Sequence, residues 1–418
     1  MKKIVGMVLC ISLILGALLS GCVEPQPESQ PETETQSRTI TIGVLLPLTG
    51  DLSSLGESSN AALAVGLEEA NTYFAEIGAN TEVELIIEDT ETDTAVALAK
   101  LKKLDEAGVK VVIGPVSSTV LRGIKDYANE NGIVLISLST APGLAIADDN
   151  VLRLVPDDNG QAGAIAALMQ RDGIKAIVSI VRDDVWGNEL YGAARNQMDG
   201  VEELEKVTYN TAAGTFSEPL DVVNAKVEEA IGNYGEGAVG VYLVSFEEGI
   251  PLLKEAAGYE ALGDVKWYGN DVLANEQKIV EDAVIADFAI KTGLINPVFG
   301  SEEETPTFEY VEGRITEMIG RKPDAYAIAA YDAFWLATNA YMDNPNDASI
   351  KKVLVITAEY YYGATGWTIL NEAGDRKYGD YDLWTVNEDR EWEIAARYQI
   401  DPWVGGRLLI GEEMTSGY

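Results

Sequence analysis

Two small clusters of hydroxyl side chains follow two apolar segments in the first part of the chain. Residues 117–119 (Ser-Ser-Thr) come after the apolar run 111–113, and residues 139–140 (Ser-Thr) come after the apolar run 133–138. If both runs are neighbouring strands of a parallel sheet, their carboxyl ends lie at one edge, where open α/β sheets bind ligands. The spacing therefore predicts a single polar site that both clusters share.

The side chains of these clusters are suited to binding an anion. Ser118 and Thr119 would begin the helix between the two strands, and the free N–H groups and positive dipole end of a helix start favour negative charge. Together with Ser139 and Thr140 they offer hydroxyl donors for a group of carboxylate size. The sequence leaves open the alternative that residues 117–119 only cap a helix.

Elements with the periodicity of an α/β protein surround this stretch. A β-rich run (residues 39–46) and a loop (47–56) precede a helix whose apolar residues recur from 63 to 77 at helical spacing. An alternating strand (83–87) and a helix (93–106) follow. Short connections between alternating strands and helices predict a parallel sheet covered by helices on both faces.

The same alternation restarts after Val155 and predicts a second α/β unit. Strands are expected at residues 176–181, 238–246 and 265–269, with helices between them. The tail has a different pattern, with helices at 307–319, 324–342 and 350–358 and strand-like segments at 366–370, 382–386 and 392–398. We therefore expect two α/β units followed by a tail of helices and then strands.

The N-terminus has the pattern of an export signal with a lipid-attachment site. Lys2 and Lys3 precede an apolar core shorter than a membrane span, and the segment ends in Leu-Ser-Gly-Cys at Cys22. Because this ending resembles a bacterial lipobox, we expect residues 1–22 to be a lipoprotein signal with lipid attached to Cys22. The alternatives are an ordinary signal peptide with an incidental cysteine and an uncleaved anchor. Residues 23–38, rich in Pro, Glu, Gln, Ser and Thr, are expected to be a disordered tether.

The composition excludes several classes of function. The chain carries 30 Lys and Arg against 68 Asp and Glu, a net charge of −38, which repels nucleic acid. It has no histidine, which excludes Ser-His-Asp and Cys-His catalysis and histidine-based metal sites. Its cysteines are Cys10, inside the leader, and Cys22, so we expect no disulfide framework and no thiolate metal site.

Two segments match known binding motifs in part, but neither meets the requirements of its motif. Residues 235–240 read Gly-Glu-Gly-Ala-Val-Gly, but they follow a helix and precede a strand, the reverse of a dinucleotide-binding arrangement, so we predict a turn. The acidic run 89–93 lacks the glycine and the final glutamate of a calcium loop. We therefore expect no cofactor, no metal site and no enzymatic activity.

Seven segments, in order along the chain, resemble the leucine/isoleucine/valine-binding type of extracytoplasmic solute-binding protein, which serves ABC importers. They are residues 42–57, 86–104, 111–124, 135–144, 151–166, 326–338 and 363–384. The resemblance implies the α/β, two-lobed type I periplasmic-binding-protein fold, in which parallel-sheet lobes close on a ligand about a three-segment hinge. It places lobe one at residues 39–155 and 297–381, and lobe two at residues 156–296 and 382–418.

The resemblance also implies which residues hold the charged ends of an amino acid. The family binds the carboxylate with a serine at a helix start and a threonine in the next loop, which match Ser118 and Thr140. It binds the α-ammonium with a glutamate of lobe two, and the matching stretch offers a shorter acid, Asp271. The alternative for Asp271 is an exposed loop acid.

Three further positions would surround the ligand side chain by the same resemblance. Trp186 lies in a predicted turn (183–187), and Phe246 lies at the end of the predicted strand 238–246. Leu55 occupies a loop position where relatives often carry an aromatic residue. Core packing is the alternative for Trp186 and Phe246. Because Asp271 and Leu55 differ from the residues that relatives carry, the preference of the site for a particular ligand side chain stays open.

The resemblance implies a carrier that binds an amino acid, branched-chain or otherwise apolar, and then docks on ABC permease subunits. We expect a monomer that only its lipid anchor holds to the membrane, at the extracytoplasmic face. The alternative from another class is a ligand-sensing receptor or regulator component for an amide, urea or small organic acid, because related folds serve as receptor ectodomains. A hydrolase would need a nucleophile–base pair that the sequence does not show.

Overall fold

A computed structural model of the chain describes residues 38–211, 214–300, 305–344, 349–401 and 405–414. The predicted signal segment, its Cys22 and residues 23–37 of the predicted tether lie outside these ranges. Arg38, expected to be the last residue of the tether, is instead the first residue of a strand. Within the described ranges, no helix has the length and apolar character needed to cross a membrane.

The first lobe is built on a five-stranded parallel sheet in the order β2-β1-β3-β4-β5. Its strands are β1 (Arg38–Leu46), β2 (Thr81–Asp89), β3 (Val111–Ile113), β4 (Val134–Ser137) and β5 (Val151–Arg153). Helices α1 (Ser53–Glu76), α2 (Thr94–Glu106) and α3 (Ser118–Glu130) connect the first four strands. Every residue of β3 and β4 is buried, as expected for parallel strands covered on both faces, so the predicted parallel sheet is confirmed.

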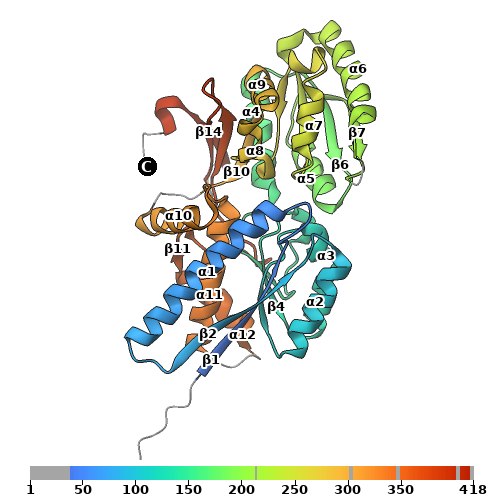
Figure 1. Cartoon of the computed structure of the whole chain (residues 1–418). Helices are drawn as coiled ribbons and strands as arrows, with labels where there is room; N and C mark the ends of the chain where they lie inside the picture. The colour runs from blue at the N-terminus through green and yellow to red at the C-terminus, as the bar shows by residue number, and fades with distance from the viewer. Residues whose placement is uncertain (1–37, 212–213, 301–304, 345–348, 402–404, 415–418) are drawn as a thin grey trace, which may run out of the picture. The chain divides into compact units, whose positions relative to one another are not determined.

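Helices from the tail of the chain return to this first sheet. They are α10 (Pro306–Ile319), α11 (Ala325–Asp343) and α12 (Ile350–Tyr360). Helix α11 packs against α1, β1 and β3, and Figure 1 shows the orange tail helices beside the blue N-terminal elements. A Cβ at Gly66 of α1 would lie only 2.6 Å from the Phe334 ring of α11, so glycine allows this close helix contact. Two distant parts of the sequence thus share one core.

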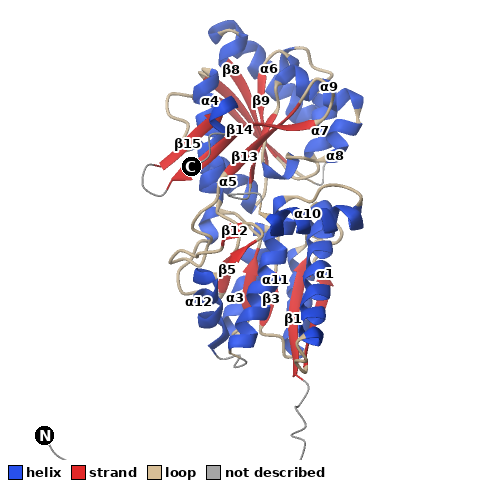
Figure 2. Cartoon of the chain, turned by 90° about the vertical axis from the view of Figure 1, so that its left-hand side faces the viewer, coloured by secondary structure: helices blue, strands red, loops and turns tan. Residues whose placement is uncertain are grey.

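The second lobe is built on an eight-stranded sheet in the order β15-β14-β13-β10-β9-β8-β6-β7, seen together in Figure 2. Its strands are β6 (Ala176–Arg182), β7 (Glu202–Tyr209), β8 (Val239–Val244), β9 (Lys266–Tyr268), β10 (Ile295–Phe299), β13 (Tyr381–Val386), β14 (Trp392–Asp401) and β15 (Gly405–Ile410). Its helices are α4 (Asp158–Asp172), α5 (Val185–Arg195), α6 (Ser217–Tyr234), α7 (Gly249–Ala256), α8 (Gln277–Glu281) and α9 (Ala283–Thr292). Strands β6 to β10 pair in parallel, and β13 to β15 add antiparallel strands to β10.

The remaining elements are short. They are the two-stranded sheet β11 (Tyr362–Gly363) and β12 (Gly366–Trp367), and the 3-10 turns η1 (Pro142–Leu144), η2 (Glu236–Ala238), η3 (Ala261–Gly263), η4 (Asp271–Leu273) and η6 (Gly411–Met414). The glycine-rich residues 235–240 form η2 and the start of β8, which confirms the predicted turn.

Two of the three segments predicted to cross between the lobes lie in paired strands of the second sheet, and the third lies between β5 and α4. Residues 296–297 lie inside β10, residues 381–382 begin β13, and these two strands pair directly, with Val298 opposite Asp382. Residues 155–156 lie between β5 of the first sheet and α4. The lobe boundaries stay a prediction, and the paired strands β10 and β13 are the elements that would form most of the hinge.

The structure corrects several predicted elements. Helix α1 begins at Ser53, so Leu55 lies in its first turn and not in a loop. Trp186 is not in a turn, because the Asp184 side chain accepts a hydrogen bond of 2.7 Å from Gly187 N and so caps α5, which begins at Val185. The predicted strand at 366–370 shortens to the two residues of β12, and α8, α9 and β15 were not predicted.

Candidate ligand-binding site

A small cavity lies between side chains of the two lobes, at the carboxyl ends of the central strands. Its walls are Leu52, Leu55, Val116, Ser118, Leu138, Thr140 and Tyr326 from the first lobe, and Trp186, Phe246, Asp271 and Val272 from the second. The structure therefore brings together all the predicted site residues except Thr119 and Ser139. The remaining space is about 20 Å³, roughly the room that one water molecule needs.

The first hydroxyl cluster both caps a helix and reaches the cavity. Ser117 is the N-cap of α3 and accepts a hydrogen bond of 3.4 Å from Val120 N, as the capping alternative requires. Ser118, the next residue, is only 2% exposed and lines the cavity. Its Oγ accepts a hydrogen bond of 3.2 Å from Ala141 N, which joins the start of α3 to the loop after β4.

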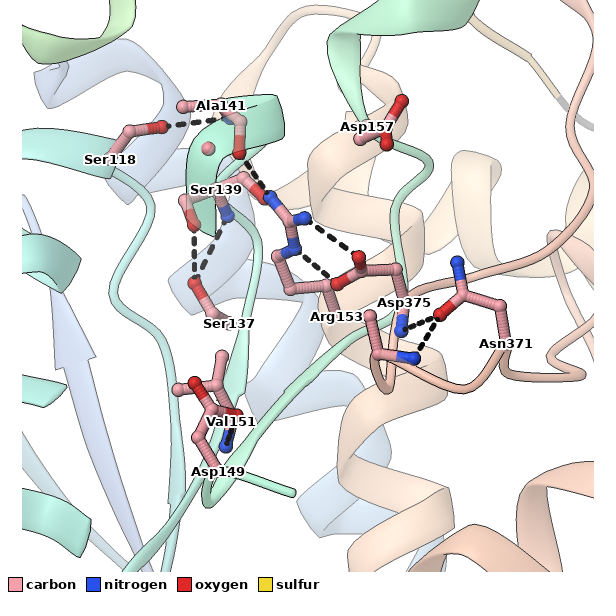
Figure 3. Close-up of polar contacts among 12 residues, drawn as sticks. Ser118, Ser137, Ser139, Ala141, Asp149, Val151, Arg153, Asp157, Asn371 and Asp375 are labelled. Atoms are coloured by element: carbon pink, nitrogen blue, oxygen red, sulfur yellow. Dashed lines mark hydrogen bonds and ion pairs between the residues drawn. The ribbon is translucent and has the colours of Figure 1, made fainter. Parts of the chain in front are cut away.

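A buried ion pair holds the loop after β4 through a hydrogen bond to the carbonyl oxygen of Ala141 (Figure 3). The Arg153 guanidinium pairs with the Asp375 carboxylate through two hydrogen bonds and donates another of 2.8 Å to the carbonyl oxygen of Ala141. Ser139 Oγ takes part in a 2.9 Å hydrogen bond with Ser137 Oγ, and Ser139 does not line the cavity. The loop is thereby fixed with Thr140, and not Ser139, directed at the site.

Thr140 and Trp186 connect the lobes at the cavity wall. Trp186 Nε1 donates a hydrogen bond of 3.2 Å to Thr140 Oγ1. Thr119 lies elsewhere, because its hydroxyl donates to the Asp184 carboxylate at 3.4 Å. Thr140 is therefore the threonine of the two clusters that faces the cavity.

The aromatic wall is held rigidly from the second lobe. The rings of Trp186 and Phe246 lie with their centroids 4.8 Å apart. The Arg182 guanidinium lies 3.4 Å from the Phe246 centroid and pairs with Asp184 and Glu248. The charge of Arg182 is thus neutralised by these two acids. The residue serves to position the aromatic side chains.

Asp271 supplies a carboxylate from the second lobe. It is 5% exposed, its backbone N–H donates to Gln161 Oε1 at 3.1 Å, and its Oδ2 accepts a hydrogen bond from the Tyr326 hydroxyl of α11. Among the described residues, Oδ1 has no hydrogen-bond partner. Burial raises the pKa of Asp271 to about 6, against the hydrogen bonds from Tyr326 and Gln161 that lower it. The predicted acid is therefore buried in the site and is not an exposed loop residue.

A second buried carboxylate, which the sequence did not predict, lies beside the first. Asp158 is the first residue of α4, is 1% exposed, and accepts a hydrogen bond of 3.0 Å from Gln161 Nε2. Gln161 therefore bridges Asp158 and the backbone of Asp271. Burial, and after it the neighbouring charge of Asp271, raise the pKa of Asp158 well above its ordinary value. The Asp158 Oδ2 atom has no hydrogen-bond partner among the described residues.

The arrangement places complementary polar groups on opposite walls of an apolar cavity. Hydroxyl groups lie on the first-lobe wall, the Asp271 carboxylate lies on the second-lobe wall, and apolar side chains line the space between them. Within the described ranges, no group of three or more acidic, histidine or cysteine side chains is placed to hold a metal ion.

Comparisons with known proteins agree with this architecture. The family described as the receptor family ligand binding region matches residues 61–389. An uncharacterized protein of Methanocaldococcus jannaschii is 31% identical over 407 residues, which cover 92% of this chain and 95% of that protein. The leucine-, isoleucine-, valine-, threonine- and alanine-binding protein of Pseudomonas aeruginosa is 23% identical over 84% of this chain and 91% of its own length.

A solved structure shows the same fold. The branched-chain amino acid transporter substrate-binding protein of Streptococcus pneumoniae, in complex with isoleucine, superposes with a TM-score of 0.72 at 19% sequence identity. The superposition covers 90% of this chain and 100% of the other.

Proposed function

Because this chain belongs to the family of receptor ligand-binding regions and has the two-lobed fold of type I periplasmic binding proteins, we propose that it binds an apolar amino acid between its lobes. The name of the Pseudomonas aeruginosa relative and the isoleucine in the Streptococcus pneumoniae structure support this ligand class. In this proposal the ligand leaves chemically unchanged and the protein is not an enzyme.

One observation carries the proposal: complementary polar groups face one apolar cavity from opposite lobes. Ser118 and Thr140 present hydroxyl groups from the first lobe, while Asp271 presents a carboxylate from the second. Hydroxyl donors suit the carboxylate of an amino acid, and a buried carboxylate suits its ammonium group. A zwitterion would therefore use both lobes at once, which links binding to their closure.

The hydrogen bonds within the cavity indicate how a ligand would enter. Without a ligand, the Asp271 Oδ2 atom accepts a hydrogen bond from Tyr326 and Thr140 Oγ1 accepts one from Trp186, and both bonds run from one lobe to the other. The remaining space of about 20 Å³ is too small for an amino acid, so the lobes must separate before binding. The ammonium and carboxylate of the ligand would then replace the two bonds between the lobes.

Replacing Asp271 with asparagine tests the role of the carboxylate. We expect Asp271→Asn to weaken binding by about 30-fold to several thousand-fold, because losing one partner of a buried charged pair costs about 2–5 kcal/mol. The measurement is calorimetric titration with L-leucine, L-isoleucine, L-valine and L-phenylalanine. The matched control is Asp126→Asn, an acid with 83% of its side chain exposed, which should leave the affinity unchanged. Equal affinity of both variants would remove Asp271 from the site.

We further propose that the protein is a lipid-anchored component of an ABC importer, at the extracytoplasmic face of the cytoplasmic membrane. The support is the Leu-Ser-Gly-Cys segment ending at Cys22 and the transporter role stated for the Streptococcus pneumoniae protein. We expect Cys22→Ser to release the protein from the membrane fraction. Unchanged membrane association would contradict the lipid anchor.

The receptor description of the family favours a second candidate, a sensor or regulator component. In that case the ligand would be an amide, urea or a small organic acid, and the lobes would signal to a partner and not deliver cargo. Genes for two permeases and two ATPases beside the gene of this chain would favour the carrier. Their absence, with a signalling gene in their place, would favour the sensor.

A further inference from the structure

Two buried acidic side chains interact at the candidate site: Asp271 in the cavity wall and Asp158 beside it. Asp158 and Asp271 are both bridged by Gln161, and each keeps one carboxylate oxygen without a hydrogen-bond partner among the described residues. Neither acid has an ion pair with Lys or Arg among the salt bridges of the described residues. Two buried carboxylates that interact with each other repel strongly when both are ionised.

The groups that face this pair do not neutralise it. They are Asp157, Arg153, Tyr242, Tyr326 and Tyr381. Arg153 is the cation among them, and its guanidinium is already paired with Asp375.

The hydroxyl groups around the two carboxylates stabilise their negative charge only in part. Tyr326 donates to Asp271, and a hydrogen bond from the Thr140 hydroxyl lowers the pKa of Asp158 against the larger effect of burial. Tyr381 donates to the Asp157 carbonyl at 3.1 Å. The Tyr242 hydroxyl has no partner among the described residues. Burial and the nearby acids raise the pKa of Tyr242, Tyr326 and Tyr381, so all three stay neutral at physiological pH.

We propose that the ligand-free site holds one proton between Asp158 and Asp271, and that the ammonium group of a ligand takes the place of this proton. The proton leaves to solvent, and the N–H groups of the ammonium bind the free oxygens of both carboxylates. Binding therefore releases one proton, and acidification weakens it. This inference rests on the amine ligand proposed above.

The pKa directions agree with that geometry. Burial raises the pKa of both acids, to about 6 for Asp271 and well above the ordinary range for Asp158. Both shifts are in the direction that a proton shared by the two carboxylates requires. Below the upper titration step of the pair, the Kd for an amine should rise by up to about tenfold per pH unit.

The first test needs no ligand. In protein labelled with carbon-13 at the aspartate carboxyl carbons, the NMR signals of Asp158 and Asp271 are followed against pH and assigned with Asp158→Asn and Asp271→Asn. We expect one of the two carboxyls to remain protonated at pH 7. If both are ionised at pH 7, the shared proton does not exist.

The second test measures the proton released on binding. L-Leucine, L-isoleucine, L-valine and L-phenylalanine are titrated at pH 7.5 in phosphate and in Tris, whose ionisation enthalpies differ. We expect close to one proton released per amino acid bound, near zero for Asp158→Asn, and an unchanged value for the control Asp126→Asn. Amino acid binding with no proton release in the wild type would overturn the inference while leaving the proposed function intact. If none of the four binds, the proposed function fails, and the NMR titration still decides on the proton.

Discussion

At the residue scale, Asp271 has two properties that oppose each other. Its carboxylate lines the cavity and is the group that we propose binds the ammonium of the ligand, yet burial disfavours its charged form and raises its pKa to about 6. Residues that bind charged ligands commonly reduce the stability of the ligand-free protein for this reason. The two effects can be separated by measuring stability and binding on the same variant.

We expect Asp271→Asn to stabilise the ligand-free protein above pH 6. The folded-state pKa lies above the ordinary value of 3.8, so the stability that Asp271 provides is complete below pH 3.8 and is lost as the pH rises through about 6. A shift of this size corresponds to about 3 kcal/mol at pH 8. Thermal unfolding should show a higher Tm than wild type at pH 8 and nearly the same Tm at pH 4. A lower Tm at both values would show that Asp271 is structurally required.

The sequence identified residues of this site only where a recognisable pattern surrounded them. Ser118 and Thr140 follow two strands in a regular way, and the structure places both at the cavity. Tyr326 was missed because it begins an apolar helical run, where a tyrosine is expected to be core. Asp158 was missed because it follows Asp157, which forms the N-cap, and sequence cannot show which of two adjacent acids points inward.

At the scale of elements, helix α5 of the second lobe contacts the first lobe outside the cavity. Its Glu189 accepts a hydrogen bond of 2.7 Å from Gly143 N in η1 and forms an ion pair with Arg122 of α3. A Cβ at Gly143 would lie 2.8 Å from the Glu189 carboxylate oxygens, so glycine is needed for this approach. Because Glu189 does not line the cavity, it acts on the contact between lobes and not on the ligand.

Neutralising Glu189 should weaken the binding of every ligand by the same factor. We expect Glu189→Gln to raise the Kd about 3- to 10-fold, because the contact stabilises the closed arrangement by about 0.5–1.5 kcal/mol. The ratios of Kd between leucine, isoleucine, valine and phenylalanine should not change. Glu205→Gln, the same substitution at an exposed position of β7, is the control. A change in selectivity would mean that Glu189 reaches the ligand.

The positions of elements were easier to predict than their ends. The apolar periodicity located the core of α1 but missed its beginning, because the first turn at Ser53 has few apolar residues and no side-chain cap. Strand β15 was missed because it begins with Gly405 and Gly406, which are unfavourable in strands, and it is held by pairing with β14. The beginning of α1 and the existence of β15 therefore depend on tertiary contacts, which the local sequence does not show.

At the scale of the whole molecule, the described part of the chain forms a five-stranded and an eight-stranded sheet, each with its own helices, and a short two-stranded sheet. Strands β10 and β13, where two of the predicted crossings between the lobes lie, pair with each other inside the eight-stranded sheet. The bonds from Tyr326 to Asp271 and from Trp186 to Thr140 connect the lobes across the cavity. A ligand that replaces both bonds must provide an acceptor and a donor in the same orientation. A zwitterion meets this requirement, because its carboxylate accepts hydrogen bonds and its ammonium donates them. The two bonds together, and not one side chain, therefore favour a zwitterion.

Calorimetry with analogues that lack one charged end tests this central claim most directly. Wild-type protein is titrated with L-leucine, with 4-methylpentanoic acid, which lacks the amine, and with 3-methylbutylamine, which lacks the carboxylate. We predict that leucine binds tightest and that each analogue binds at least about 30-fold more weakly, since each leaves a buried polar group unpaired. Equal binding of leucine and 4-methylpentanoic acid would contradict the account and identify an organic-acid site in its place.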